Sequence, residues 1–103
     1  MSVIVVATSR PKPEKRAEVI AALEAAIVRV HAEDDGCELY ALNETSDRLV
    51  MIEKWRDQAA LDAHSRGAAL AELQGGLNGR LTEPTEVVVL TPHPAGTARQ
   101  GAV

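Results

Sequence analysis

Two short segments near opposite ends of the chain consist almost entirely of β-branched apolar residues, Val3 to Ala7 and Val87 to Leu90. Such residues favour strands, and the side chains of a strand point alternately to the two faces of its sheet. Strands with one face in water alternate between apolar and polar residues, and these two segments do not. The chain must therefore form a sheet that is covered on both faces.

The covering layers have to be built from small aliphatic side chains. Of the 103 residues only Tyr40 and Trp55 are aromatic. A single domain of this size has a thin core, to which a partner subunit would add buried surface. We expect residues 1–92 to form this domain and residues 93–103 to form a flexible tail, because all periodicity ends at Pro92.

After the first strand the apolar residues recur every three or four positions, which predicts a helix from Glu14 to about Glu33. The apolar stripe of this helix comprises Ile20, Leu23, Ile27 and Val30. Asp34-Asp35-Gly36 ends the helix, and we expect Gly36 to take the left-handed conformation that commonly ends helices.

Residues 37–43 and 48–55 read as two strands of a hairpin, with Asn43 paired to Arg48 and Tyr40 opposite Met51. Alternation separates their side chains into two faces. The helix-covered face would carry Tyr40, Met51, Glu53 and Trp55, and the other face Leu39, Ala41, Val50 and Ile52.

Two further helices are predicted before the last strand. Asp57 is a good N-cap for the first, Gln58 to Ser65, and Gly67 separates it from the second, which carries Leu70, Leu73 and Leu77. The order β-α-β-β-α-α-β is that of an α+β, ferredoxin-like split βαβ domain with a four-stranded antiparallel sheet. Its helices lie on one face of the sheet, so the apolar second face predicts a homodimer joined through the sheets.

Composition excludes several classes of partner. Fifteen acidic and eleven basic residues give a net charge of −4, which argues against nucleic acid and anionic membranes. The apolar stretch at the N-terminus is too short to span a bilayer. Cys37 is the only cysteine, is expected to face the dimer side, and suggests a cytoplasmic protein. No spacing indicates a metal site, and no glycine-rich motif indicates a bound cofactor.

His64 and the residues facing it are the candidates for chemistry. His64 shares a helix face with Ala60 and Leu61, so it could act as an acid or base in a pocket or serve as a structural histidine. Trp55 could stack on an aromatic substrate or belong to the core. Tyr40 could donate a hydrogen bond into the pocket or bridge the sheet and the helices.

Glu53 and Met51 share that face and are candidate substrate contacts. A carboxyl group there cannot stay unpaired at low cost. Burial would raise its pKa towards that of a general base, whereas an arginine would keep it ionised. We expect an ion pair with Arg66 or Arg80, or a hydrogen bond to a neighbouring helix.

Four segments together resemble the antibiotic biosynthesis monooxygenase family of dimeric α/β-barrel domains, over roughly residues 3–92. They are Val3-Ile4-Val5-Val6-Ala7-Thr8; Ala32-Glu33-Asp34-Asp35-Gly36-Cys37-Glu38-Leu39-Tyr40; Glu53-Lys54-Trp55 followed by Ala60-Leu61-Asp62-Ala63-His64; and Glu86-Val87-Val88-Val89-Leu90. The resemblance implies a ferredoxin-like protomer, a homodimer and a pocket between sheet and helices. Some members of that family oxygenate phenols or quinols with dioxygen and without metal, flavin or haem; others are isomerases, haem degraders or proteins without known activity.

The chain departs from this family at two points. Asp34-Asp35-Gly36 stands where the family usually has an acid, a proline and a glycine, a change expected to be confined to the helix end. Haem-degrading members share an Asn on the first strand and a His in the last helix. Neither is present at Ala7 to Ser9 or Ala68 to Leu77, which disfavours haem.

The hypothesis is a cofactor-independent monooxygenase that oxidises a small phenolic, quinol or polyketide-like aromatic compound with dioxygen. His64 would be the acid or base, Tyr40 a hydrogen-bond donor and Trp55 a stacking wall, with a planar ligand touching all three between the layers. Two alternatives keep the fold: an isomerase or decarboxylating enzyme of small ring compounds, and a non-catalytic dimer that binds small molecules.

Overall fold

The computed structural model describes residues 1–103, the whole chain. Its elements are β1 (Val3–Ser9), a short 3-10 helix η1 (Pro13–Lys15), α1 (Arg16–Glu33), β2 (Cys37–Glu44), β3 (Leu49–Trp55), α2 (Gln58–Ser65), α3 (Ala68–Leu77) and β4 (Glu86–Leu90). The strands form one antiparallel sheet in the order β2-β3-β1-β4. The chain thus has the ferredoxin-like α+β fold predicted from its pattern.

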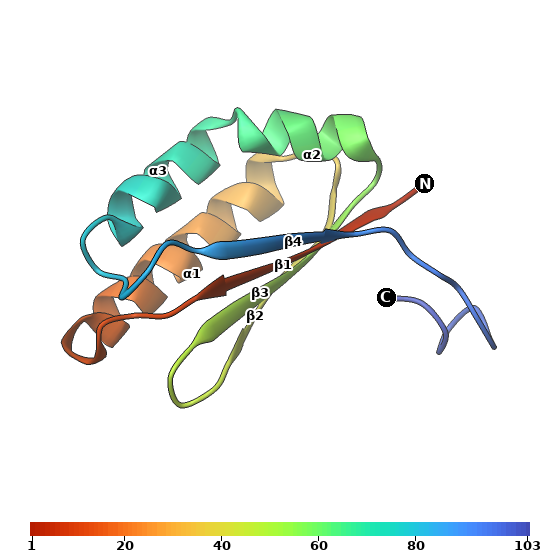
Figure 1. Cartoon of the computed structure of the whole chain (residues 1–103). Coiled ribbons are helices and arrows are strands. Elements are labelled where there is room, and N and C mark those ends of the chain that lie inside the picture. The colour runs from red at the N-terminus through yellow and green to blue at the C-terminus, as the bar shows by residue number, and fades with distance from the viewer.

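All three helices lie on the same face of the sheet, with α1 and α3 side by side (Figure 1). The core lies between these layers. Trp55, Leu49, Val19 and Val30 are its largest fully buried side chains. None of the helices combines the length and the apolarity that a membrane span requires.

No helix or strand covers the opposite face of the sheet, and residues beyond β4 lead away from the helices (Figure 1). This outer face is apolar. Leu39, Val88 and Leu90 are 37%, 43% and 42% exposed there, while Val50 and Ile52 are partly buried by their neighbours. The outer face leaves apolar surface in water that a second layer would bury.

The two faces of the hairpin are as predicted, but its register is wrong by two residues. Asn43 pairs with Val50 rather than Arg48, and Tyr40 lies opposite Glu53 rather than Met51. A shift of two residues preserves the faces, since side chains alternate with a period of two. The strand pattern therefore fixes the faces, while the length of the turn decides the register.

A second difference is a register shift in β2 between Cys37 and Leu39, where the ladder contains one extra residue. The irregularity interrupts the alternation of side chains. Cys37 consequently packs against the core cluster and lies opposite Trp55, so the prediction that it faces the dimer side is wrong.

Gly36 does not adopt the predicted left-handed conformation; the glycines with positive φ are Gly79 and Gly96. Gly36 is required for packing instead. A Cβ atom at this position would overlap the Cβ atom of Ala60 in α2. The amide of Arg56 also donates to the Gly36 carbonyl at 2.9 Å, so this turn lies directly under the start of α2.

Candidate functional site

A cavity of about 900 Å³ lies between the helix-covered face of the sheet, α2, α3 and the loop that joins α3 to β4. Thirteen of its 24 lining residues are hydrophobic. Val87 and Val89 line it from β4, yet they remain 59% and 55% exposed, which shows that the cavity opens along this strand. Its volume lies within the range of small-molecule binding sites.

Three rings from three elements pack together at the inner part of the cavity. The His64 imidazole, on α2, stacks on the indole of Trp55 from β3, with centroids 4.4 Å apart. Tyr40, on β2, contacts both edge-on at centroid distances of 6.2 Å to Trp55 and 5.6 Å to His64. His64 is only 4% exposed. The side chain of His64 therefore points towards the sheet, as the spacing of apolar residues around it in α2 predicts.

The imidazole is held from its other side by Asp34, which follows the last residue of α1. The Nδ1 atom of His64 and the Oδ2 atom of Asp34 are 2.6 Å apart. A carboxylate in this position accepts the hydrogen of Nδ1, so Nε2 is the nitrogen without a hydrogen whenever the imidazole is neutral. No other group of the chain bonds to Nε2, and His64 lines the cavity.

Sequence reasoning missed Asp34, which it assigned only to a helix end. One physical signal was available. The C-terminus of a helix carries a partial negative charge and favours cations, so an acid at this place is better explained by a partner elsewhere. The pattern alone does not name that partner, because His64 is 30 residues away along the chain.

Glu53 has neither of the partners predicted for it. Its carboxylate accepts a hydrogen bond from Nε1 of Trp55 at 2.9 Å, whereas Arg80 binds Glu18 on the outside of α1. The Glu53 side chain makes no ion pair and is 5% exposed. Burial raises the pKa of this carboxyl, while the Trp55 hydrogen bond and the nearby His64 oppose the shift. Glu53 is therefore an acid whose neutral form is favoured by its surroundings.

Tyr40 lies opposite Glu53 in the sheet and lines the cavity. Its hydroxyl group bonds to no other group of the chain and is not shut away from the cavity. Burial first, and the neighbouring charge of Glu53 second, raise the pKa of the Tyr40 hydroxyl. Tyr40 therefore stays protonated across the neutral range and can donate a hydrogen bond to a ligand.

The structure brings the five predicted site residues together, but only four of them border the cavity. Tyr40, Met51, Glu53 and His64 all line the cavity. Trp55 is fully buried beneath His64 and does not form part of the wall. A ligand between Trp55 and His64, as the sequence suggested, has no space, because the two rings are already in stacking contact.

Comparisons with known proteins agree with this fold. A family model described as antibiotic biosynthesis monooxygenase matches residues 2–75. A relative from Mycobacterium tuberculosis, named "Putative monooxygenase Rv0793", is 37% identical over 92 residues, which cover 87% of this chain and 90% of the relative. The solved structure of Rv0793 superimposes with a TM-score of 0.86 at 31% identity and covers 94% of this chain and 100% of its own.

A conserved protein from Methanosarcina mazei Go1 has a similar structure. Its TM-score is 0.80 at 28% identity, with 87% of this chain and 91% of that chain covered. The similarity thus extends over nearly the whole domain, including the elements that carry His64 and Asp34.

Proposed function

The chain belongs to the antibiotic biosynthesis monooxygenase family, and from this premise we propose that it is a monooxygenase of small phenolic, quinol or polyketide-like aromatic compounds. The observation that carries the proposal is the 2.6 Å contact between Asp34 and His64 at the wall of an apolar cavity. This contact gives a buried histidine one fixed orientation and one free nitrogen.

The first step assigned to the site is removal of a proton from the aromatic hydroxyl group. Nε2 of His64 accepts this proton, and Asp34 stabilises the resulting imidazolium through Nδ1. Stacking on Trp55 fixes the plane of the imidazole, so that the ring does not have to reorient during transfer.

The deprotonated aromatic compound then reduces dioxygen itself. One oxygen atom forms a bond to a ring carbon, and the other leaves as water with the proton of the hydroxyl group and the hydrogen of the attacked carbon. The ring becomes a quinone, and it supplies all the electrons. In this reaction the protein has to exclude water, accept and return a proton, and stabilise the oxyanion that develops.

Tyr40 is the residue best placed for the last of these tasks. Its hydroxyl group is free within the chain, stays protonated and lies on the same cavity wall as His64. A hydrogen bond from Tyr40 to the ring oxygen would stabilise the negative charge left after proton removal. Met51 and the leucines of α3 would hold the aromatic plane.

The active form in this proposal is a homodimer joined through the outer faces of two sheets. The outer face carries apolar side chains from all four strands, and Leu39, Val88 and Leu90 are exposed there in the single chain. A second copy offers the same apolar surface, so pairing would bury both surfaces at once.

Oxygen uptake tests the proposed reaction. Chelator-dialysed protein is mixed with anthrone or 1,4-dihydroxynaphthalene, and dioxygen is followed by electrode while the quinone is followed by absorbance. We expect one dioxygen consumed per quinone formed, without release of hydrogen peroxide and above the rate of autoxidation, and loss of this excess in His64→Gln. Substrate conversion without oxygen uptake would favour the isomerase or decarboxylase. Saturable binding without conversion would favour a binding dimer.

A further inference from the structure

The cavity wall contains no lysine and no arginine. Of its 24 residues, only Glu53 and Glu83 belong to a residue type that is normally ionised at neutral pH, and both are acids. His64 is the one wall residue that can become cationic, and its Nδ1 atom already faces the carboxylate of Asp34. The wall therefore offers an anionic ligand no counter-charge of its own.

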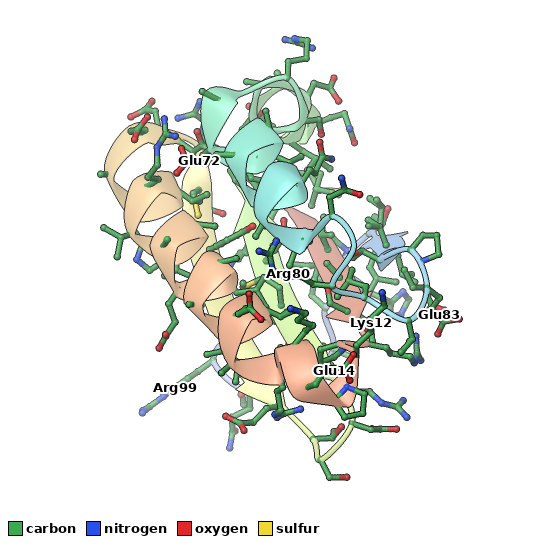
Figure 2. The ribbon with its side chains drawn as sticks, turned by 90° about the vertical axis from the view of Figure 1, so that its left-hand side faces the viewer. Lys12, Glu14, Glu72, Arg80, Glu83 and Arg99 are labelled. Atoms are coloured by element: carbon green, nitrogen blue, oxygen red, sulfur yellow. The ribbon has the colours of Figure 1, made fainter.

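Three cations beside the loop that joins α3 to β4 already have partners within the chain. Arg10 forms an ion pair with Glu83 at 3.3 Å, and Lys12 donates to the Gly79 carbonyl at 2.9 Å. Arg80 lies between α1 and α3, where it binds Glu18 (Figure 2). The same view places Glu83 at the edge of the loop that joins α3 to β4 (Figure 2). These ion pairs and hydrogen bonds hold the loop to the rest of the domain and already occupy the three basic groups.

At the inner part of the cavity, the only acid–base groups besides His64 are Tyr40 and Glu53. Glu53 uses one carboxyl oxygen to accept the indole hydrogen of Trp55, and its second oxygen bonds to no group of the chain. Tyr40 likewise has a free hydroxyl. Both groups can bond to a hydroxyl or carbonyl oxygen of a ligand, and neither neutralises an anion.

We propose that the cavity selects uncharged hydroxyaromatic ligands and rejects the corresponding carboxylates and phosphate esters. An anion that enters loses its hydration without gaining a cationic partner, which is unfavourable in an apolar site. A phenol loses little hydration free energy on entering and can form hydrogen bonds with Tyr40 and Glu53. This inference rests on the proposed function and restricts its aromatic substrates to uncharged compounds.

The test compares three ligands of one scaffold by isothermal titration calorimetry at pH 7.5: 2-naphthol, 6-hydroxy-2-naphthoate and its methyl ester. The ester keeps the scaffold of the carboxylate, adds one methyl group and lacks the charge. We expect the ester to bind at least about tenfold more tightly than the carboxylate, because the carboxylate stays unpaired. A carboxylate that binds as tightly as the ester would overturn the inference.

The second part of the test is a variant designed to bind the carboxylate more tightly. Gln74 is exposed on α3 and lines the cavity, so Gln74→Arg places a cation at the wall without changing the core. We expect its affinity for the carboxylate, relative to the ester, to rise about fivefold. Ala71→Arg, on the same helix but outside the wall, is the control, and its relative affinity for the carboxylate and the ester should equal that of the wild type. No gain in Gln74→Arg, or an equal gain in both variants, would overturn the inference.

The two proposals can fail separately. Selective binding of 2-naphthol and the ester without oxygen uptake in the electrode assay would remove the monooxygenase proposal and leave the charge preference intact. Failure of all three ligands to bind would overturn the aromatic ligand class and the charge preference together.

Discussion

The imidazole of His64 lies on the indole of Trp55, with ring centroids 4.4 Å apart and planes inclined by 29°. This stack leaves no room for a ligand between the two rings, and it changes the role of the tryptophan. Trp55 supports the histidine from below and also holds Glu53 through Nε1. One indole therefore positions two of the ionisable groups of the cavity, His64 and Glu53.

Asp34→Asn should lower turnover by about 10- to 100-fold with little change in KM, because Asn can present its amide hydrogens to Nδ1 and favour the wrong tautomer. The measurement is kcat from oxygen uptake with a confirmed substrate, together with the pH profile of the rate. Asp35→Asn is the matched control, since its side chain is 96% exposed and does not contact the histidine. Equal activity in both variants would contradict the assignment of Asp34 as a positioning residue.

Glu53→Gln should be more stable than the wild type at neutral pH and should lose this advantage in acid. The folded-state pKa of Glu53 is raised above 4.5, so folding favours the protonated acid. The corresponding stability is fully present below about pH 4.5 and is lost as pH rises through the folded pKa. Gln cannot ionise and escapes this loss. Melting temperatures from pH 4 to 8 would show a gap that widens with pH.

Glu24→Gln provides the control for this pH series, because Glu24 is exposed on α1 and forms no ion pair. A constant difference between Glu53→Gln and the wild type across the range would show that Glu53 does not titrate inside the folded protein.

Gly36→Ala should destabilise the domain by about 1–3 kcal/mol, as overpacked sites do, because the new methyl group would overlap Ala60. Gly75→Ala has open space around its Cβ and lies in α3, so it should stabilise by about 0.5–1 kcal/mol. Urea unfolding followed by circular dichroism would measure both. Gly36→Ala combined with Ala60→Gly should recover part of the loss; no recovery would locate the clash elsewhere.

Ile52→Asp should convert a dimer into a monomer, because Ile52 lies near the middle of the outer face on β3. Light scattering at micromolar concentration should give twice the 11.0 kDa chain mass for the wild type and a single chain mass for the variant. Val28→Asp, at a 70% exposed position on α1, should leave the dimer intact. A monomeric wild type would refute the proposed sheet-to-sheet pairing.

Removal of residues 96–103 should change the melting temperature by no more than about one or two degrees, as expected for a segment without buried apolar contacts. The side-chain hydrogen bonds of this segment join its own residues, such as Thr97 and Gln100. A loss of several degrees would instead show that the tail docks on the domain or on a second subunit.

The sequence predicted the order of elements and the faces of the strands because both follow from local periodicity. The alternation of apolar residues in β3 identified the buried side of the sheet, and Asp57 marked the start of α2, where its side chain accepts from Ala60 at 2.8 Å. Gly36 was misread because its environment is set by α2, more than 20 residues later. A local pattern holds no information about such an approach.

The candidate site was predicted in part for the same reason. Periodicity placed Tyr40, Glu53 and His64 on facing layers, which the structure confirms. The partners of these residues depend on tertiary distances. The predicted partner of Glu53 is an arginine or a group of a neighbouring helix, but the indole of Trp55, two residues away on the same face of β3, bonds to it instead. Asp34 meets His64 only because the end of α1 lies against α2.

The buried position of Trp55 has an optical consequence. It is the only tryptophan of the chain, so all indole emission comes from one ring that is shielded from water and stacked on His64. The intrinsic fluorescence of the protein therefore reports on a single place, the contact between Trp55 and His64, in the native molecule and without any added label.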